Sequence, residues 1–223
     1  MSDSAKGVLA MVAACTIWGL SPLFYALLSH IPPMEVLAHR TLWSLVIFAG
    51  ILALQGRLAE LPVALSTRRR FLLVALSTAM ISVNWFLFIY AVGVGRTVEA
   101  SLGYYIYPLV AVAIGAVILR ESLGALQAVA VALAAGAVLI LTVGLGVPPW
   151  ISLTLATTFG VYGLLKRWVA AGPVVSVTSE VLLFLPLALG YLIWVASDRG
   201  LSLSPRDLAL FIASGPMTAV PLI

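Results

Sequence analysis

The sequence predicts an all-α integral membrane protein, and three observations carry that prediction. Hydrophobic residues make up 63% of the 223 residues, and charged residues make up only 9%. A soluble domain is about half apolar, so the mean hydropathy of +1.17 indicates a chain that lies mostly in lipid. The apolar residues form continuous runs instead of the alternating pattern of a β-barrel strand. A run of roughly 20 apolar residues crosses the hydrocarbon core as one helix.

The apolar runs place seven complete spans and the start of an eighth along the chain. The final run continues to Ile223 without a basic stop or a polar tail, so we expect the eighth span to be truncated. The expected spans are 7–29, 34–54, 71–94, 98–118, 123–144, 150–165, 174–196 and 208–223.

The basic residues indicate how these spans are oriented. An N-terminus in the cytoplasm puts eight basic side chains inside and three outside, and leaves Arg40 within a span. Loops on the cytoplasmic side of membrane proteins are enriched in Lys and Arg, so we expect the N-terminus to be cytoplasmic. The eight expected inside are Lys6, Arg57, Arg68, Arg69, Arg70, Arg120, Lys166 and Arg167.

An internal repeat relates the two ends of the chain. Shifting the sequence so that residue 17 falls on residue 158 aligns IWGLSPL (17–23) with TFGVYGL (158–164) and places His39 on Glu180. This shift is called the repeat shift below. Span 1 then matches span 6, so each repeat holds five spans, and an odd number turns the second copy upside down. Inverted repeats are typical of secondary transporters. We expect a first five-helix repeat at 1–146 and an incomplete second repeat at 147–223.

Three ionisable groups open the second span, in the segment EVLAHR (35–40). Glu35 lies in the first turn, where the helix dipole favours an acid, and Arg40 is expected to snorkel outward. His39 lies one turn deeper, at a depth that the repeat relates to Glu180. One hypothesis is two gates, with His39 and Arg40 toward the outside and Glu180 toward the cytoplasm. The alternative is that each group only pairs with a neighbouring helix.

The third span carries a polar side chain near its middle. Asn84 and Trp85 lie within a long uncharged stretch, where a buried amide needs hydrogen-bond partners. Asn84 is either a link between helices or part of a cavity wall, and both alternatives stay open here.

The fourth span opens with RTVEASLGYYIYPLV (96–110). Thr97 is expected to cap the helix, and Glu99 either stabilises the first turn or serves as a coupling carboxylate. Tyr104 and Tyr107 are three residues apart and share one face. The candidates for a substrate cavity are Trp18, Asn84, Trp85, Tyr104, Tyr107 and Tyr162, and those for gating or coupling are His39, Arg40, Glu99 and Glu180.

Enzyme signatures are missing from the sequence. It contains no P-loop, no H-E-x-x-H and no G-x-S-x-G motif. One cysteine, Cys15, and two histidines argue against a zinc site. We expect no enzyme activity, no catalytic residue, no metal and no cofactor. The net charge of +4 is explained by basic loops, so no nucleic-acid partner is expected.

Several segments resemble one transporter family. They are IWGLSP (17–22), HRTLWS (39–44), NWFLFIYAV (84–92), EASLGYYIYPLV (99–110), LRESL (119–123), FGVYGLLKR (159–167) and AVPLI (219–223). They resemble the RarD-type branch of the EamA transporters, in the drug/metabolite transporter superfamily. The resemblance implies ten helices in two inverted repeats around a central cavity, in a multi-pass protein of the bacterial inner (plasma) membrane. Such relatives carry Phe and Asn at Tyr105 and Tyr107, so the specificity of the cavity is expected to differ.

The leading functional hypothesis is a secondary transporter, a permease or exporter of a small organic metabolite or drug that works by alternating access. Its expected partners are the lipid bilayer and a small-molecule substrate, with proton coupling as one option. A membrane scaffold or regulatory protein and a lipid flippase are the alternatives. Substrate, transport direction and oligomeric state stay open at this point.

Overall fold

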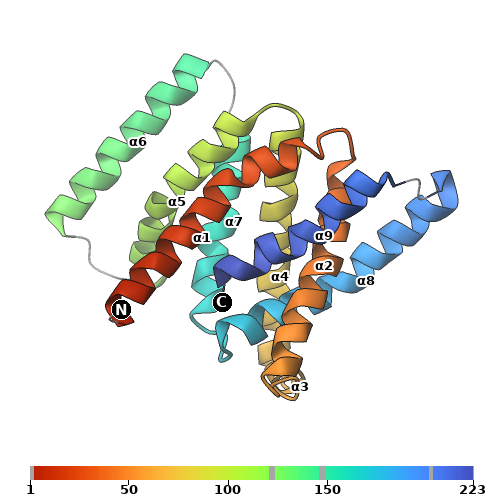
Figure 1. Cartoon of the computed structure of the whole chain (residues 1–223). Coiled ribbons are helices and arrows are strands. Elements are labelled where there is room, and N and C mark those ends of the chain that lie inside the picture. Colours follow the sequence, from red (N-terminus) through yellow and green to blue (C-terminus); the bar gives the residue numbers. More distant parts are fainter. Residues whose placement is uncertain (1–2, 121–123, 146–148, 201–202, 223) are drawn as a thin grey trace. The chain divides into compact units, whose positions relative to one another are not determined.

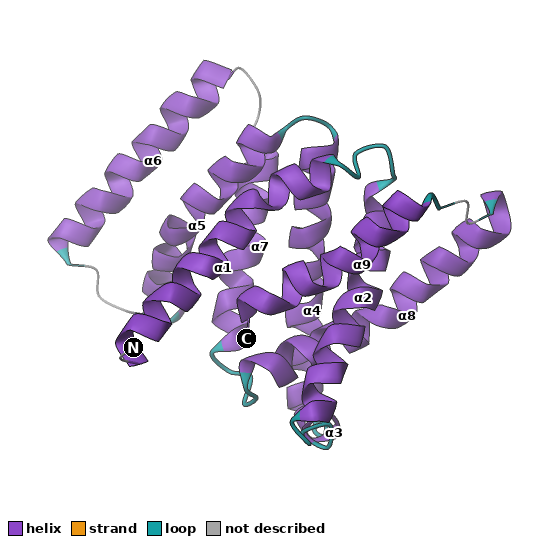
Figure 2. Ribbon diagram, in the orientation of Figure 1, coloured by secondary structure: helices purple, strands orange, loops and turns teal. Residues whose placement is uncertain are grey.

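The computed structural model describes residues 3–120, 124–145, 149–200 and 203–222, and every regular element among them is a helix (Figures 1 and 2). The predicted all-α class is therefore confirmed. The segment 121–123, which completes LRESL, lies outside the described residues. The elements are α1 (Asp3–Ala26), α2 (Pro33–Leu54), α3 (Glu60–Ala64), α4 (Arg68–Gly93), α5 (Thr97–Ile118), α6 (Ala125–Leu145), α7 (Trp150–Lys166), α8 (Pro173–Arg199), α9 (Pro205–Ala219) and the 3₁₀ turn η1 (Val220–Leu222).

Six helices of the described chain are long and apolar enough to cross a membrane. α7, with 17 residues, and α9, with 15, are shorter than a typical span. The expected seven complete spans and truncated eighth therefore stay a prediction. The six spans are Gly7–Ala26, Pro33–Leu54, Arg68–Gly93, Thr97–Ile118, Ala125–Gly144 and Pro173–Asp198.

The chain divides into two compact units. Unit 1 comprises Met1–Thr78 and Val169–Ile223, and unit 2 comprises Ala79–Trp168. α4 runs from the first unit into the second. The predicted repeats, 1–146 and 147–223, follow a different division, because a repeat is a relation between sequences and its copies need not be compact by themselves. The repeat boundaries remain a prediction.

In unit 1, α2 packs against both α8 and α9. α2 begins at Pro33, a residue that suits the first helical position because its missing N–H has no partner there. Ala38 packs against Ala188 and Leu192 of α8. At the other end of α2, Leu52 packs with the start of α8 and with the short helix α3, an element that the hydropathy pattern did not predict.

A glycine brings α2 and α9 to backbone distance. A Cβ added at Gly215 of α9 would lie 2.7 Å from the carbonyl oxygen of Trp43. Real Cβ atoms do not come that close to a backbone oxygen, so only glycine permits this approach. The two helices are therefore held close together at this point.

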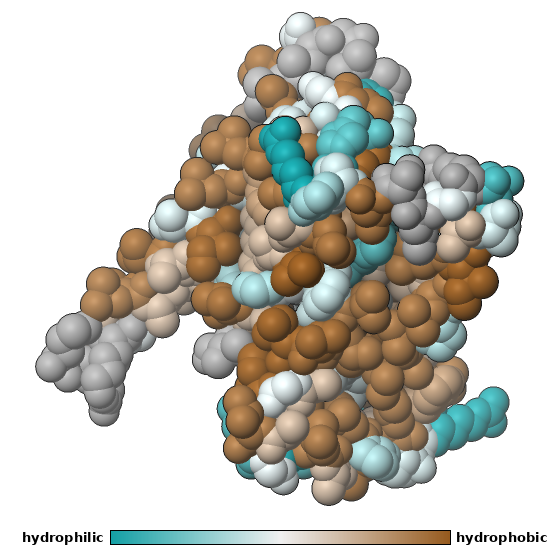
Figure 3. Space-filling view, turned by 45° about the vertical axis from the view of Figure 1, so that its right-hand side comes forward, coloured by the Kyte–Doolittle hydropathy of each residue, from teal (hydrophilic) through white to brown (hydrophobic). Residues whose placement is uncertain are grey.

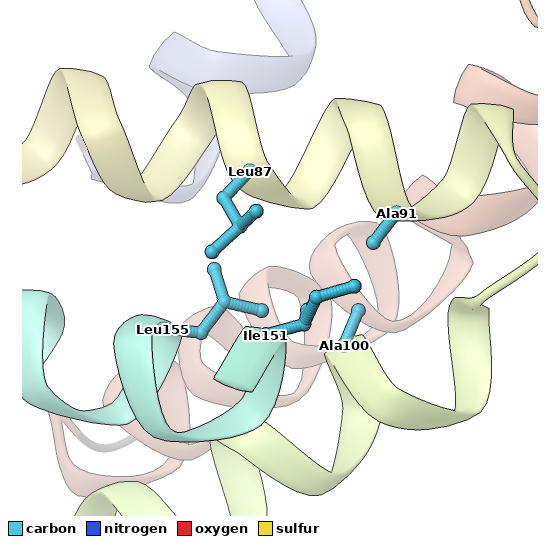
Figure 4. Packing of buried hydrophobic residues seen from close by; sticks show 5 residues of the cluster. All are labelled: Leu87, Ala91, Ala100, Ile151 and Leu155. Carbon is cyan, nitrogen blue, oxygen red and sulfur yellow. The ribbon is translucent and has the colours of Figure 1, made fainter. Parts of the chain in front are cut away.

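In unit 2, α5 packs along α7 and the second half of α4 covers both. Figure 4 shows Leu87 and Ala91 of α4 pointing toward Ile151 and Leu155 of α7, with Ala100 of α5 beside them. These buried residues form the apolar core on which the polar groups of unit 2 are positioned.

Apolar side chains also dominate the exposed surface. α6 exposes large residues along its length, among them Leu133 at 71% and Ile140 at 75%. Brown apolar residues cover much of the face visible in Figure 3, and teal hydrophilic residues form smaller patches. In water such a surface is an aggregation hazard; in lipid it is the ordinary exterior of a membrane protein.

Candidate substrate and gating sites

Asn84 links α4 to α5 and α7 in unit 2. Its amide nitrogen donates to the carbonyl oxygen of Leu155 at 2.9 Å and to the hydroxyl of Thr158 at 3.0 Å, both on α7. The hydroxyl of Tyr104, on α5, donates to the amide oxygen of Asn84 at 3.2 Å. Asn84 is 1% exposed, so these bonds replace the water that the amide gives up on burial.

Four aromatic side chains form what we call the aromatic row of unit 2: Tyr104, Tyr107, Phe159 and Tyr162. Phe159 of α7 is its centre, with ring centroids 6.0 Å from Tyr104, 4.8 Å from Tyr107 and 6.0 Å from Tyr162. None of the four side chains is fully buried. The row ends at Lys166, whose ammonium lies 5.3 Å from the centroid of the Tyr162 ring.

The structure thus brings together Asn84, Tyr104, Tyr107 and Tyr162 of the predicted cavity residues. Trp85 is half-buried on α4, and Trp18 belongs to unit 1, where 47% of it is exposed. Phe159 was missed. The signal for it was present, because the repeat shift places Trp18 on Phe159.

Glu99 forms an ion pair with a neighbour. The guanidinium of Arg96 donates to both carboxylate oxygens, at 2.5 and 2.7 Å, and lies over the ring of Trp150. Arg96 occupies the N-cap position and makes no side-chain cap hydrogen bond. The expectation that Thr97 caps this helix is therefore wrong, because the helix already begins at Thr97. Glu99 remains in the first turn, as expected.

His39 lies at the contact of α2 with α9. Its ring stacks on that of Phe211 with centroids 4.0 Å apart and planes 12° from parallel. His39 is 7% exposed, and neither ring nitrogen has a hydrogen-bond partner in the described chain. The indole nitrogen of Trp43, one turn further along α2, is also buried and has no partner there. Such atoms are rare in folded proteins and call for an explanation.

Arg40 is buried, which corrects the expectation that it snorkels outward. It is 8% exposed, its Nε donates to the hydroxyl of Thr218 at 2.9 Å, and its guanidinium lies 5.8 Å from the centroid of the Tyr25 ring. The physical reason is a partner 178 residues away in the chain, which offsets the cost of burying the charge.

Glu180 lies in the same unit, on α8, and is 1% exposed. The hydroxyl of Ser176 donates to its carboxylate at 3.5 Å, and the hydroxyl of Thr78 on α4 approaches its backbone oxygen at 3.4 Å. Glu180 therefore lies where α8 meets the start of α4, as His39 lies where α2 meets α9.

Two polar contacts lie outside the spans. His30 Nε2 lies 3.2 Å from a carboxylate oxygen of Asp207, near the start of α9. The hydroxyl of Ser204 donates to the same carboxylate, and this bond, with a smaller contribution from His30, lowers the pKa of Asp207. In the loop between α2 and α4, hydrogen bonds from Arg57 lower the pKa of Glu60. No group of three metal-ligating side chains occurs among the residues that the structure describes.

Apolar helices of membrane-spanning length, packed through buried polar side chains, define a multi-pass membrane protein. Residues 5–143 match the model of the EamA-like transporter family. The chain belongs to that family.

Curated relatives match the whole chain. Protein RarD of Streptomyces exfoliatus is 43% identical over 229 residues, which cover 100% of this chain and 71% of that protein. An uncharacterized transporter of Vibrio cholerae is 37% identical, over 99% of this chain and 74% of its own length. The uncharacterized transporter YojE of Bacillus subtilis is 39% identical, over 100% of this chain and 76% of its own length. The RarD-type resemblance is confirmed. No solved structure matches the chain.

Proposed function

We propose that the protein is a secondary transporter that moves a small organic metabolite or drug across a bacterial inner membrane by alternating access. The observation that carries the proposal is a pair of repeat-related helix contacts in unit 1. The repeat shift maps α2 onto α8 and the start of α4 onto α9. The contact of α2 with α9 and that of α8 with α4 are therefore equivalent in the repeat.

Two contacts related by an inverted repeat would open toward opposite sides of the membrane. His39 lies in one contact, and its repeat partner Glu180 lies in the other. We assign the first to an outer gate, which includes Arg40, and the second to a cytoplasmic gate. This assignment assumes the cytoplasmic N-terminus that the basic loops favour, and the ten-helix, two-repeat architecture that the sequence resemblance implies. The family match over 5–143 coincides with the predicted first repeat.

The cavity residues supply the remaining part of the proposal. Asn84, Tyr104, Tyr107, Phe159 and Tyr162 form a connected group of polar and aromatic side chains at membrane depth. Polar groups there are costly and mark substrate pathways. We assign this group to the wall of the substrate site, with Glu99 as a structural ion pair.

The gates are tested by replacing two buried serines with cysteine and measuring how readily each cysteine is labelled. Ser214 of α9 and Ser179 of α8 are both 0% exposed, and each adjoins one gate. Each is replaced by Cys in a Cys15→Ser background, and labelling by an impermeant thiol reagent is measured from each side of the membrane. His39→Ala should increase labelling of Ser214→Cys from outside, and Glu180→Gln should increase labelling of Ser179→Cys from the cytoplasm. Unchanged labelling at both sites in both variants would contradict the gates.

Orientation is tested in the same background. Ser66 lies in the loop between α2 and α4, and its replacement by Cys should be shielded from an impermeant reagent added to intact cells. Rapid labelling would overturn the cytoplasmic N-terminus and exchange the two gates, without contradicting transport itself.

A further inference from the structure

Three consecutive arginines, Arg68, Arg69 and Arg70, form the first turn of α4. The N-terminal end of a helix carries a positive partial charge, so acidic side chains are favourable there and basic side chains are not. No acidic residue occupies this turn. The hydroxyl of Thr67 accepts a hydrogen bond from the backbone N–H of Arg70 at 3.2 Å, which satisfies one donor of the helix end without adding negative charge. The positive charge at this end of α4 is therefore left for an anion to offset.

The acid of the loop before α4 is already paired. Glu60 accepts two hydrogen bonds from Arg57, at 2.6 and 2.9 Å. This forked pair uses both carboxylate oxygens, so the charge of Glu60 is matched within the loop.

The three arginines of α4 differ in their contacts. One guanidinium nitrogen of Arg70 donates to the carbonyl oxygen of Val63 at 3.0 Å and to the hydroxyl of Ser66 at 3.3 Å. Arg70 therefore holds the loop against the helix. Arg68 and Arg69, which we call the arginine pair, are exposed, and their guanidinium groups make no hydrogen bond or ion pair with the residues that the structure describes. The arginine pair is available to a ligand.

The register of α4 separates the arginine pair from Arg70. Arg70 stands four residues before Val74, which is buried, and therefore above the packed face of the helix. The arginine pair stands four and three residues before Leu72, which is 48% exposed, and the same face continues to Leu76, which is 52% exposed. The arginine pair thus lies at the end of an exposed apolar stripe.

A basic group at the end of an apolar stripe matches the two parts of a phospholipid. α4 is one of the helices of membrane-spanning length, and its span begins at Arg68. An exposed stripe within a span faces acyl chains, so the turn that precedes it lies at the level of the headgroups. Arginine binds phosphate through two parallel hydrogen bonds, and basic residues at the end of a span attract anionic lipids. A lipid with a net negative charge offsets the arginine pair, whereas the choline of phosphatidylcholine already neutralises its own phosphate.

We propose that the arginine pair binds the phosphate of an anionic phospholipid whose acyl chain lies along Leu72 and Leu76. The lipid supplies the negative charge that the first turn of α4 lacks, and the stripe contacts its chain. This inference goes beyond the proposed transport function and does not depend on it, because a lipid site neither requires nor prevents flux.

Local quenching by lipids tests the site. A fluorophore is attached to Leu72→Cys in a Cys15→Ser background, and the full chain is reconstituted into phosphatidylcholine vesicles. A small, equal fraction of either phosphatidylglycerol or phosphatidylcholine then carries a nitroxide quencher on its acyl chain, close to the headgroup. Two arginines at a lipid surface should give phosphatidylglycerol about a tenfold preference at this position. Val143→Cys is the matched reporter: Val143 is 78% exposed on α6, a helix without charged residues, so it should show no preference.

Variants assign the preference to the arginine pair. Arg68→Gln and Arg69→Gln should each reduce it several-fold, and together they should abolish it. Arg70→Gln is the matched charge control, because the guanidinium of Arg70 contacts the loop, and most of the preference should persist. Arg68→Lys combined with Arg69→Lys keeps the charge and should retain most of the preference, so a loss of charge is distinguished from damage to the helix.

Three results would overturn the proposal. The first is equal quenching by the two lipids at Leu72→Cys. The second is a loss of preference in Arg70→Gln as complete as that in the double glutamine variant of the arginine pair. The third is displacement of phosphatidylglycerol by soluble glycerol phosphate at constant ionic strength, which would assign the arginine pair to a free phosphate compound instead of a lipid.

Discussion

Asn84 in unit 2 and His39 in unit 1 are both buried polar side chains within a membrane helix, yet one has three hydrogen-bond partners and the other has none in the described chain. The difference extends through both units. Each buried side-chain nitrogen or oxygen without a partner among the described residues lies in unit 1, on His39, Trp43, Ser44 and Ser77. In unit 2, Ser152 and Thr158 donate to backbone oxygens of α5 and α7.

A satisfied polar network holds its helices in one arrangement, because separating them breaks every bond at once. Buried polar atoms without partners have the opposite effect: they favour any state in which water or another helix reaches them. The comparison therefore predicts a rigid platform in unit 2 and a contact in unit 1 that opens.

A second difference lies within unit 1, between the two helix contacts that the predicted repeat relates. Arg40 and Thr218 hydrogen-bond at the contact of α2 with α9. The repeat shift places Val181 and Ser77 at the contact of α8 with α4. Valine offers no donor, and the hydroxyl of Ser77 is left without a partner in the described chain. The contact of α2 with α9 thus has a hydrogen bond that the contact of α8 with α4 lacks at the pair of residues related by the repeat shift.

The largest effect is expected at the close approach of α2 and α9. Gly215→Ala places a Cβ 2.7 Å from a backbone oxygen, and backbone atoms cannot move aside as a side chain can. We expect a loss of about 2–3 kcal/mol of stability, as for other overpacked sites. The measurement is thermal unfolding in detergent, with Ser214→Cys labelling as a second readout.

Gly190→Ala is its matched control. Gly190 lies in α8 of the same unit, and a Cβ there meets nothing within 4 Å. The control should be neutral or stabilise the helix by up to about 1 kcal/mol. Equal melting temperatures for the two variants would show that α2 and α9 are not held at backbone distance.

The next prediction tests the comparison of polar groups directly. Asn84→Ala removes the hydrogen bonds that Asn84 makes with Leu155, Thr158 and Tyr104 and should cost about 1–2 kcal/mol, in keeping with hydrogen bonds between membrane helices. Ser77→Ala removes a hydroxyl without a partner in the described chain and should change stability by less than about 0.5 kcal/mol. Both changes are measured by thermal unfolding in detergent. If Ser77→Ala were the more damaging, the contrast between the units would be lost.

How far the sequence predicts this molecule depends on the range of the interactions involved. The runs at 34–54 and 98–118 match α2 and α5 to within one residue at the start of each helix, because hydropathy is a local property. The spacing of Tyr104 and Tyr107 placed both on one side of α5 for the same reason. These parts of the fold and the candidate site were predictable.

Other features needed the tertiary structure. Arg40 was expected to snorkel outward, and its partner Thr218 is far away in the chain. The absence of hydrogen-bond partners for His39 among the described residues is likewise a property of the packed helices and has no sequence signal. The short helix α3 is too brief for a periodic pattern.

A smaller effect is expected from the hydrogen bond that distinguishes the two contacts. Thr218→Val keeps the volume of the side chain and removes the acceptor of Arg40. A net hydrogen bond is worth about 1 kcal/mol, which corresponds to roughly a fivefold change in the population of the open state. Ser214→Cys should therefore label several-fold faster from outside, and Ser179→Cys should not. Faster labelling at both positions would indicate general loosening instead of a specific latch.

The smallest effect is expected outside the span, where Asp207 meets His30 and Ser204 at the start of α9. The pKa of Asp207 is lowered in the folded protein, first by the hydrogen bond from Ser204 and then by His30. A carboxyl group whose pKa is lowered by folding contributes stability that is complete above its unfolded pKa, about 3.9, and that disappears as the pH falls through the lowered value. Asp207→Asn should therefore lower the melting temperature slightly at pH 7, by the equivalent of less than about 1 kcal/mol, and should have no effect at a pH below the folded pKa. The Asn side chain still accepts from Ser204, so any loss that remains at neutral pH reports the charge of Asp207 facing Ser204 and His30. A difference between wild type and Asp207→Asn that persisted undiminished into strong acid would assign the effect to helix capping instead, and the contact between α9 and the loop before α2 would then have no electrostatic component.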